Sequence, residues 1–273
     1  MKITILNTSN IHPIIITLKN WIVKHKSQHE IKLVQSKKDL TSGDILFLIS
    51  CSEILSREDR SKFKKTLLIH ASDLPKGRGW SPHIWEIINN AKHIVISLLE
   101  VEDKVDTGDI WKKKLIEIPS TALFADINEL IFNTETDLMD FAIENIDSVS
   151  PIKQEDIKPT YWPKRMPKDS EIDVYKSLDE QFNLIRVSDP IRFPAFFYKN
   201  CQKVKLNIQT IEEIPKGKEI DIHKSIVEQF NLKRVRESSS DLIPLYTWSF
   251  DYFPIFFNKN GKNFKLNVEV ADE

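Results

Sequence analysis

The chain lacks the features that mark several common protein classes. Its 39 Lys and Arg residues are balanced by 40 Asp and Glu residues, so the cationic surplus of a polyanion-binding protein is missing. We therefore expect no nucleic-acid partner. The apolar runs, such as residues 45–49, are far shorter than the ~18 residues of a membrane-spanning helix, and we expect no membrane partner. The first residues enter a strand pattern without a signal-peptide-like apolar stretch, which predicts a cytoplasmic location.

Cysteine is also scarce. Cys51 and Cys201 are too few for a disulfide framework, and no Cys/His cluster has the spacing of a zinc site. We expect free thiols and no metal. The hydrophobic content is nevertheless 41%, with 15 Phe and 6 Trp, which is enough to bury a substantial core. The sequence therefore predicts a folded protein and not a disordered one.

The chain has only six glycines, and their positions are informative. No glycine-rich phosphate loop follows the first predicted strand, where residues 7–10 read Asn-Thr-Ser-Asn, so the usual cradle of nicotinamide dinucleotides and P-loop nucleotides is missing. Three of the six, Gly77, Gly79 and Gly108, fall in two loops that each follow a predicted strand. Ligands of open α/β sheets bind at the carboxyl ends of strands, so we look for chemistry in these loops.

Alternating strand and helix patterns predict the fold class of the first part of the chain. Strands are predicted at residues 3–6, 31–34, 44–49, 66–69, 93–99 and 111–116, and helices at residues 14–26, 83–90 and 127–146. This alternation is typical of a parallel sheet covered by helices. We therefore expect an α/β, Rossmann-like domain over residues 1–150.

The remainder of the chain contains an internal duplication. The pattern at residues 171–184 recurs 48 residues later, and the pattern at residues 193–208 recurs 60 residues later. The second copy therefore carries a 12-residue insertion (60 − 48), which includes Tyr246, Trp248 and Phe250. Each copy reads as a short helix followed by a hairpin of two strands. We expect two small α+β segments, residues 151–212 and 213–273, and no solenoid, because there are only two copies.

One histidine and one aspartate stand out in the two glycine-containing loops. His70 directly follows the strand at residues 66–69, and Asp106 lies in the loop after the strand that ends near residue 99. A histidine opposite a carboxylate suits proton transfer, because a partner charge readily shifts an imidazole across neutrality. The alternative is that His70 is a structural histidine and that Asp106 caps a turn with Gly108.

The two loops read His70-x-Ser72-x-Leu74-Pro75-x-x-Arg78-Gly79 and Asp106-Thr107-Gly108-Asp109. These motifs resemble those of a known family, the formyltransferases that use N10-formyltetrahydrofolate, a group that contains methionyl-tRNA formyltransferase and the sugar N-formyltransferases. The resemblance continues through residues 161–169 and 183–186 and covers residues 1–210, which leaves the second repeat outside it.

The resemblance implies a mechanism in which an amine attacks the formyl carbon and a tetrahedral oxyanion collapses to release tetrahydrofolate. His70 would be the base or proton shuttle, and Asp106 would orient its imidazole. The family's oxyanion-binding Asn, two residues before the histidine, is Leu68 here. Loss of one such donor typically costs ~10²–10³ in turnover, so Ser72, Ser50, a backbone N–H or His70 itself has replaced it, or the site is inactive. We count Ser72 with His70 and Asp106 as candidate catalytic residues.

The resemblance further implies sites for two substrates. The folate would lie between two segments that contain Ile49, Ser50, Cys51, Val101, Glu102 and Lys104. The acceptor would be held by positive charges for a diphosphate and by aromatic rings for a base, with Lys76, Arg78, Gly79, Trp80, Tyr161 and Arg165 as candidates and Arg186 as a further cation.

Residues 78–85 look like the variant of this loop in sugar-modifying members. We therefore expect a sugar N-formyltransferase that acts on a dTDP- or UDP-linked 4-amino-4,6-dideoxy hexose for lipopolysaccharide O-antigen biosynthesis, and that forms a homodimer. The alternatives are a catalytically impaired module that binds folate or a nucleotide sugar, and a hydrolase of formyltetrahydrofolate.

Overall fold

The computed structural model describes residues 1–199, 201–229 and 253–271, which form two compact units. The first unit contains residues 1–86, 91–118 and 126–164. The second contains residues 87–90 and 119–125 and the chain from residue 165 onward, so both copies of the duplication belong to it. The predicted insertion with Tyr246, Trp248 and Phe250 lies outside the described residues.

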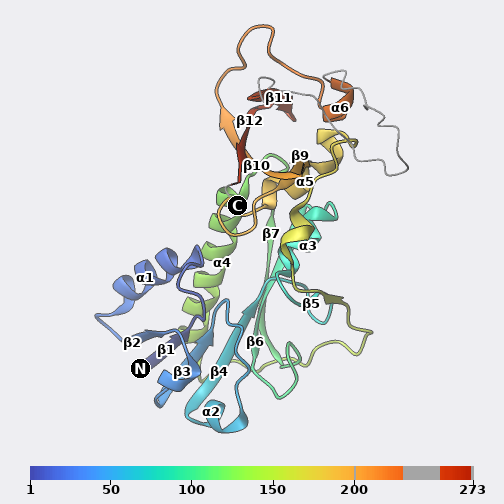
Figure 1. Cartoon of the computed structure of the whole chain (residues 1–273). Helices are drawn as coiled ribbons and strands as arrows, with labels where there is room; N and C mark the ends of the chain where they lie inside the picture. The colour runs from blue at the N-terminus through green and yellow to red at the C-terminus, as the bar shows by residue number, and fades with distance from the viewer. Residues whose placement is uncertain (200, 230–252, 272–273) are drawn as a thin grey trace. The chain divides into compact units, whose positions relative to one another are not determined.

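The first unit is built on a six-stranded sheet, which Figure 1 shows with β4 between β3 and β6. Its first four strands are parallel, and the inner residues of β1 and β3 form continuous buried runs, as expected for strands covered on both faces. The predicted α/β fold is thus confirmed. The order is β2-β1-β3-β4-β6-β7, with bounds β1 Lys2–Leu6, β2 Glu30–Val34, β3 Gly43–Leu48, β4 Phe63–His70, β6 His93–Glu100 and β7 Ile110–Glu117.

The expectation that β6 continues the parallel pattern is wrong, because β6 runs antiparallel to β4. The helix between them, α3 (Pro82–Ile88), has seven residues and rises only about 10 Å, whereas returning to the start of the eight-residue β4 needs about 26 Å. The chain therefore enters β6 from the end at which β4 finishes. β7 is antiparallel to β6, since residues 101–109 are too few for a crossover.

Two long helices of the first unit match their predictions, and one short helix was missed. α1 (Ile14–His25) and α4 (Phe124–Glu144) meet at Asp140, which accepts the Trp21 indole N–H at 2.5 Å. The missed helix, α2 (Arg57–Ser61), contains only polar residues and has no apolar period, so its one sequence signal is the capping box of Ser56 and Asp59. Short 3₁₀ turns lie at Lys37–Asp39 in the first unit and at Pro167–Ser170 in the second.

In the second unit, both copies form the predicted helix and hairpin. The first copy contains α5 (Leu178–Val187), β9 (Phe196–Lys199) and β10 (Gln202–Ile211), and the second contains α6 (Ile226–Gln229), β11 (Ile255–Lys259) and β12 (Lys262–Val270). The four strands form one antiparallel sheet in the order β11-β12-β10-β9.

The two copies pair with each other through equivalent residues. Asn207 lies opposite Asn267, which is 60 positions later, and Ser177 bridges Ser225, which is 48 positions later. The N–H of Asp179 donates to the Ile222 carbonyl, and the equivalent N–H of Val227 donates to the Val174 carbonyl. The copies are therefore related by a pseudo-twofold axis that passes between β10 and β12.

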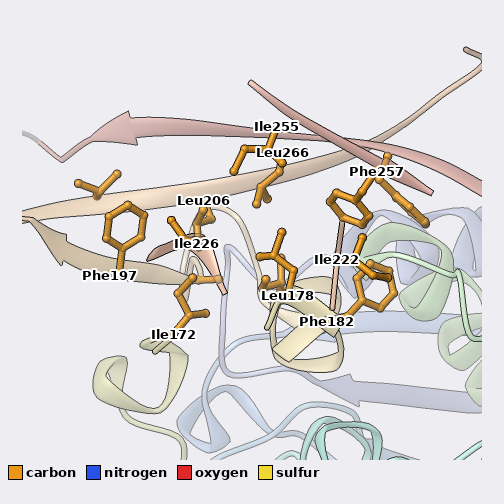
Figure 2. Close-up of a cluster of buried hydrophobic side chains, with 14 residues drawn as sticks. Ile172, Leu178, Phe182, Phe197, Leu206, Ile222, Ile226, Ile255, Phe257 and Leu266 are labelled. Carbon is orange, nitrogen blue, oxygen red and sulfur yellow. The ribbon is translucent and has the colours of Figure 1, made fainter. Parts of the chain in front are cut away.

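A single apolar core joins the two copies. Figure 2 shows side chains from α5, from both hairpins and from the segments before α5 and α6 converging on the same interior. Phe182 of α5 packs edge-on against Phe257 and Phe264 of the second copy, with ring centroids 6.2 and 5.2 Å apart. Each copy thus buries apolar surface that the other provides.

Candidate active site

His70 is the last residue of β4 and is 8% exposed. Its Nε2 lies 2.9 Å from the carbonyl oxygen of Gly77, and its Nδ1 lies 3.8 Å from Oδ1 of Asp106. A carbonyl oxygen only accepts, so the Gly77 contact assigns the ring hydrogen to Nε2. In the neutral ring, Nδ1 is then the basic nitrogen, and it faces the carboxylate.

Asp106 reaches His70 by an unexpected route. We expected β4 and β6 to be parallel and therefore to end at the same edge of the sheet. Because β6 is antiparallel to β4, Glu100 at the end of β6 lies opposite Leu67 and not opposite His70. Residues 101–109 fold back instead. The glycine at position 108 allows this, since a Cβ there would lie 1.8 Å from the Glu100 carbonyl oxygen.

The side chain and backbone of Asp106 are both held in place. The residue is 5% exposed and has a φ of 57°, in the left-handed region that few non-glycine residues adopt. Its Oδ2 accepts the N–H of Gly79 at 2.9 Å, and its carbonyl accepts the side-chain amide of Gln154 at 2.9 Å. Sequence reasoning missed Gln154, because nothing in its neighbourhood marks it as close to either loop.

The loop between β4 and α3, which contains Gly77 and Gly79 and is called the glycine loop below, is held in place by the segment that follows residue 150. The N–H of Gly77 donates to Oγ1 of Thr160, and β5 (Arg78–Gly79) pairs with β8 (Tyr161–Trp162) as a two-stranded parallel sheet. A Cβ on Gly79 would lie 2.4 Å from the Trp162 carbonyl oxygen, so this pairing requires a glycine.

Four of the predicted acceptor-binding residues are brought together by this small sheet. Arg78, Gly79, Trp80 and Tyr161 lie on or directly beside β5 and β8, and the Trp80 and Tyr161 side chains are 44% and 65% exposed. Lys164, which was not predicted, places its Nζ 5.0 Å from the centre of the Trp80 ring. The result is a partly exposed aromatic and cationic surface, and Lys76 is exposed as well.

The other two predicted cations lie in the second unit. Arg165 donates to Oγ of Ser170 at 2.7 Å, and burial lowers its pKa. Arg186 is 3% exposed, and its Nη1 donates to the carbonyls of Pro119 and Ala122. Burial lowers the pKa of Arg186 to about 10. The donors of Arg186 are thus engaged in holding the backbone of its own unit.

Ser72 and the backbone of the glycine loop are already hydrogen-bonded. The Ser72 hydroxyl is fully buried and donates to the Lys76 carbonyl at 2.9 Å. The N–H groups of residues 77–80 each donate to an acceptor. In chain order, these acceptors are the Thr160 side chain, the Thr160 carbonyl, the Asp106 carboxylate and the Trp162 carbonyl. Ser50 is exposed at the end of β3, with a φ of 48°.

The two predicted folate segments pack against one apolar cluster. Cys51 and Val101 contact the cluster that contains Leu48 and Leu55, and Leu68 contacts it as well. Burial raises the pKa of the Cys51 thiol. The Ile49 N–H donates to Leu6, and its carbonyl accepts the Asn7 amide, so the backbone of Ile49 is engaged. Glu102 and Lys104 are exposed.

Val101 also borders a surface pocket of about 280 Å³ that is rich in positive charge. Its lining includes Arg57, Arg60, Lys64, Lys65 and Glu100. Three of these cations are in ion pairs, Arg60 with Asp103, Lys64 with Asp147 and Lys65 with Glu100. Among the described residues, no group of three or more His, Cys, Asp or Glu side chains could hold a metal ion, and no helix could span a membrane.

The family model for formyl transferase matches residues 6–142, which include His70, Asp106 and both glycine loops. The methionyl-tRNA formyltransferase of Clostridium beijerinckii is 28% identical over 178 residues, 64% of this chain and 57% of that protein. That of Clostridium novyi is 31% identical over 164 residues, 59% of this chain and 53% of that protein. The chain thus matches slightly more than half the length of these curated relatives.

Solved structures agree with this relationship. Methionyl-tRNA formyltransferase from Clostridium thermocellum superimposes with a TM-score of 0.64 at 25% identity, over 78% of this chain and 94% of that one. An N-formyltransferase from Helicobacter canadensis, in complex with folinic acid and dTDP-3-aminofucose, gives 0.60 at 17% identity, over 98% and 100% of the two chains. On the sequence match over half its length and the shared fold, the chain belongs to the formyl transferase family.

Proposed function

We propose that the protein transfers the formyl group of N10-formyltetrahydrofolate to the amine of a nucleotide-linked amino sugar. The observation that carries this proposal is the double role of Gly79. Gly79 belongs to β5, beside the exposed Trp80 and Tyr161, and its N–H also holds the carboxylate that faces His70. The candidate acceptor surface and the candidate proton-transfer pair are therefore built on one short segment.

His70 would accept the proton that the attacking amine loses. In the neutral ring, the free Nδ1 takes up this proton, and the imidazolium then has a carbonyl at Nε2 and a carboxylate 3.8 Å from Nδ1. A pair of opposite charges at this distance attracts by about 4 kcal/mol at an effective dielectric constant of ~20. That attraction corresponds to about 10³ in rate, so Asp106 would be essential for the proton transfer.

The folate is the formyl donor, and the cluster that contains Cys51, Leu68 and Val101 fits its flat, weakly polar pterin ring. The basic pocket beside Val101 would suit the carboxylates of the folate glutamate. The Ser72 hydroxyl donates to the Lys76 carbonyl and the Nε2–H of His70 to the Gly77 carbonyl, so the exposed Ser50 is the remaining side chain among the predicted replacements for the family's oxyanion-binding Asn.

The acceptor class is supported by the surface around β5 and β8. A nucleobase would stack on Trp80 or Tyr161, and Arg78 and Lys164 would face a diphosphate. The relative that was solved with dTDP-3-aminofucose covers almost the full chain, which supports a sugar acceptor. The balanced charge of the chain speaks against a tRNA acceptor, although the relatives in sequence are named for that activity.

The test is release of tetrahydrofolate from N10-formyltetrahydrofolate in the presence of dTDP- and UDP-linked amino sugars, methionyl-tRNA or no acceptor. We expect release that depends on one sugar nucleotide. Release without an acceptor would instead identify a hydrolase, and release that depends on methionyl-tRNA would replace the sugar proposal. Folate binding without release would identify a binding module.

Two variants test the proposed chemistry. His70→Asn and Asp106→Asn should each lower kcat by ~10²–10⁴ while the melting temperature stays close to that of the wild type. His83→Asn is a matched control on α3, outside the proposed proton path. Turnover close to the wild-type value in either site variant would refute the assignment of His70 and Asp106.

A further inference from the structure

Gln154 has an unusual position between the two loops of the candidate site. The segment that carries it is anchored by a bridge between Ile110 and Ile152, with N···O distances of 2.7 and 2.8 Å. The half-buried Gln154 side chain then spans three groups. Its Nε2 donates to the carbonyls of Asp106 and Gly108, both at 2.9 Å, and its Oε1 accepts Nη2 of Arg78 at 2.8 Å.

This arrangement permits only one orientation of the amide. Two carbonyls can only accept, and a guanidinium can only donate, so the nitrogen must face residues 106 and 108 and the oxygen must face Arg78. A glutamate has the same shape, but it could not bind the two carbonyls, because an ionised carboxylate has no hydrogen to donate. Position 154 therefore requires a side chain that both donates and accepts hydrogen bonds, as the amide of glutamine does.

The Asp106 backbone is the part of the site that most needs such support. Its positive φ is unfavourable for a residue with a side chain, so neighbouring contacts must hold it. The Gln154 amide binds the carbonyl of Asp106 itself and that of Gly108 on the far side of the turn. The carboxylate that this turn presents faces Nδ1 of His70 and accepts the Gly79 N–H.

We propose that Gln154 is a positioning residue, which holds the Asp106 turn opposite His70 and ties it to Arg78 on the candidate acceptor surface. The proposal rests on the proposed function, in which His70 and Asp106 carry the proton. Arg78 is well placed for this link, because its Nη1 also lies 3.4 Å from the Tyr161 hydroxyl. Gln154 acts through Asp106 and need not touch either substrate.

The first test is Gln154→Glu, with Gln28→Glu as the matched control. Gln28 is exposed just beyond the end of α1, so this control makes the same change of charge away from the site. In Gln154→Glu, the contact to Arg78 survives while both bonds to the turn are lost and a charge faces two carbonyl oxygens. We expect kcat to fall by about 10²-fold, with the KM for N10-formyltetrahydrofolate within about threefold of the wild-type value.

The second test separates positioning from a general structural role. If Gln154 acts through Asp106, Gln154→Glu should lower kcat no further in an Asp106→Asn background. A further tenfold loss in the double variant would overturn the proposal, and so would wild-type kcat in Gln154→Glu alone.

A third measurement does not depend on activity. Hydrogen–deuterium exchange should become faster in Gln154→Glu for peptides that contain Gly79 and Asp106, and should stay unchanged in Gln28→Glu. Unchanged exchange would overturn the positioning role of Gln154. Absence of all formyl transfer by the wild type, with faster exchange in the variant, would instead refute only the proposed function.

Discussion

The buried carboxyl group of Glu135 predicts that the protein loses stability in alkaline solution. Glu135 lies on the inner face of α4 and is 8% exposed, and its Oε2 has no hydrogen-bond partner among the described residues. Burial raises its pKa from 4.5 to about 8. The carboxyl is therefore neutral in the folded protein at pH 7 and ionised in the unfolded chain.

The size and the sign of the effect follow from this pKa shift. A rise of about 3.5 units, at about 1.36 kcal/mol for each unit, gives an upper bound of about 5 kcal/mol for ionising the buried group. Because the folded pKa is above the unfolded one, the protonated carboxyl contributes its full stability below pH 4.5. That contribution declines as the pH rises and is lost once the pH has passed about 8.

The assay is urea unfolding of the wild type and Glu135→Gln at pH 5, 7 and 9. The amide introduced by this substitution cannot ionise, so we expect the free energy of unfolding of the variant to exceed that of the wild type at pH 9 by about 2–5 kcal/mol. At pH 5 the two proteins should differ by less than about 1 kcal/mol. Glu129→Gln, at an exposed position on the same helix, is the matched control and should follow the wild type.

The result that would refute this reasoning is a constant difference between the wild type and Glu135→Gln from pH 5 to pH 9. Any other group that titrates in this range, such as the half-buried Glu86, with a pKa raised to about 7 by burial and by the charge of Asp73, is present in both proteins. Its contribution therefore cancels in the comparison, and only the ionisation of Glu135 can change the difference.

Three further changes have defined outcomes. Gly108→Ala places a Cβ 1.8 Å from the Glu100 carbonyl oxygen and should lower the melting temperature by about 10 °C or more, whereas Gly217→Ala, with open space around it, should lower it by a few degrees at most. Arg186→Met removes the side-chain donor of the buried Ala122 carbonyl and of the Pro119 carbonyl, which keeps the Ala122 N–H, and should destabilise the protein by about 1–3 kcal/mol in urea unfolding, without changing the KM for the acceptor. Leu68→Asn restores the family's donor two residues before the site histidine and should raise kcat by about tenfold or more, at a stability cost of about 1–3 kcal/mol.

Much of the fold follows from local patterns in the sequence. The strands of the six-stranded sheet and the long helices α1 and α4 are predicted to within three residues at each end, because each combines an apolar period with clear boundaries. The direction of β6 was not predicted, since strand patterns do not encode orientation. It depends on the reach of the connection from β4, in which residues 71–81 form the glycine loop and only seven residues form a helix.

In the candidate site, the sequence predicts the reactive residues but not the residues that support them. His70 and Asp106 are predicted because their loops combine a reactive side chain with glycines at strand ends. Gln154 and Thr160 could not be predicted in this way, because the segment that carries them is held only by the bridge between Ile110 and Ile152 and by β8, a strand of only two residues. A pairing this short leaves no periodic signal, and its specificity comes from the missing side chain of Gly79.

The duplication also changes how the second copy must be tested. From the sequence, we expect that copy to be dispensable for the chemistry. Its β12 occupies the centre of the four-stranded sheet, and Phe257 and Phe264 fill the interior against Phe182 of the first copy. Deleting it would expose the apolar face of the first copy and unfold the second unit whether or not it contributes to catalysis. Only substitutions at its exposed positions, such as Glu269 of β12, can separate a role in chemistry from the role in folding that the shared core already requires.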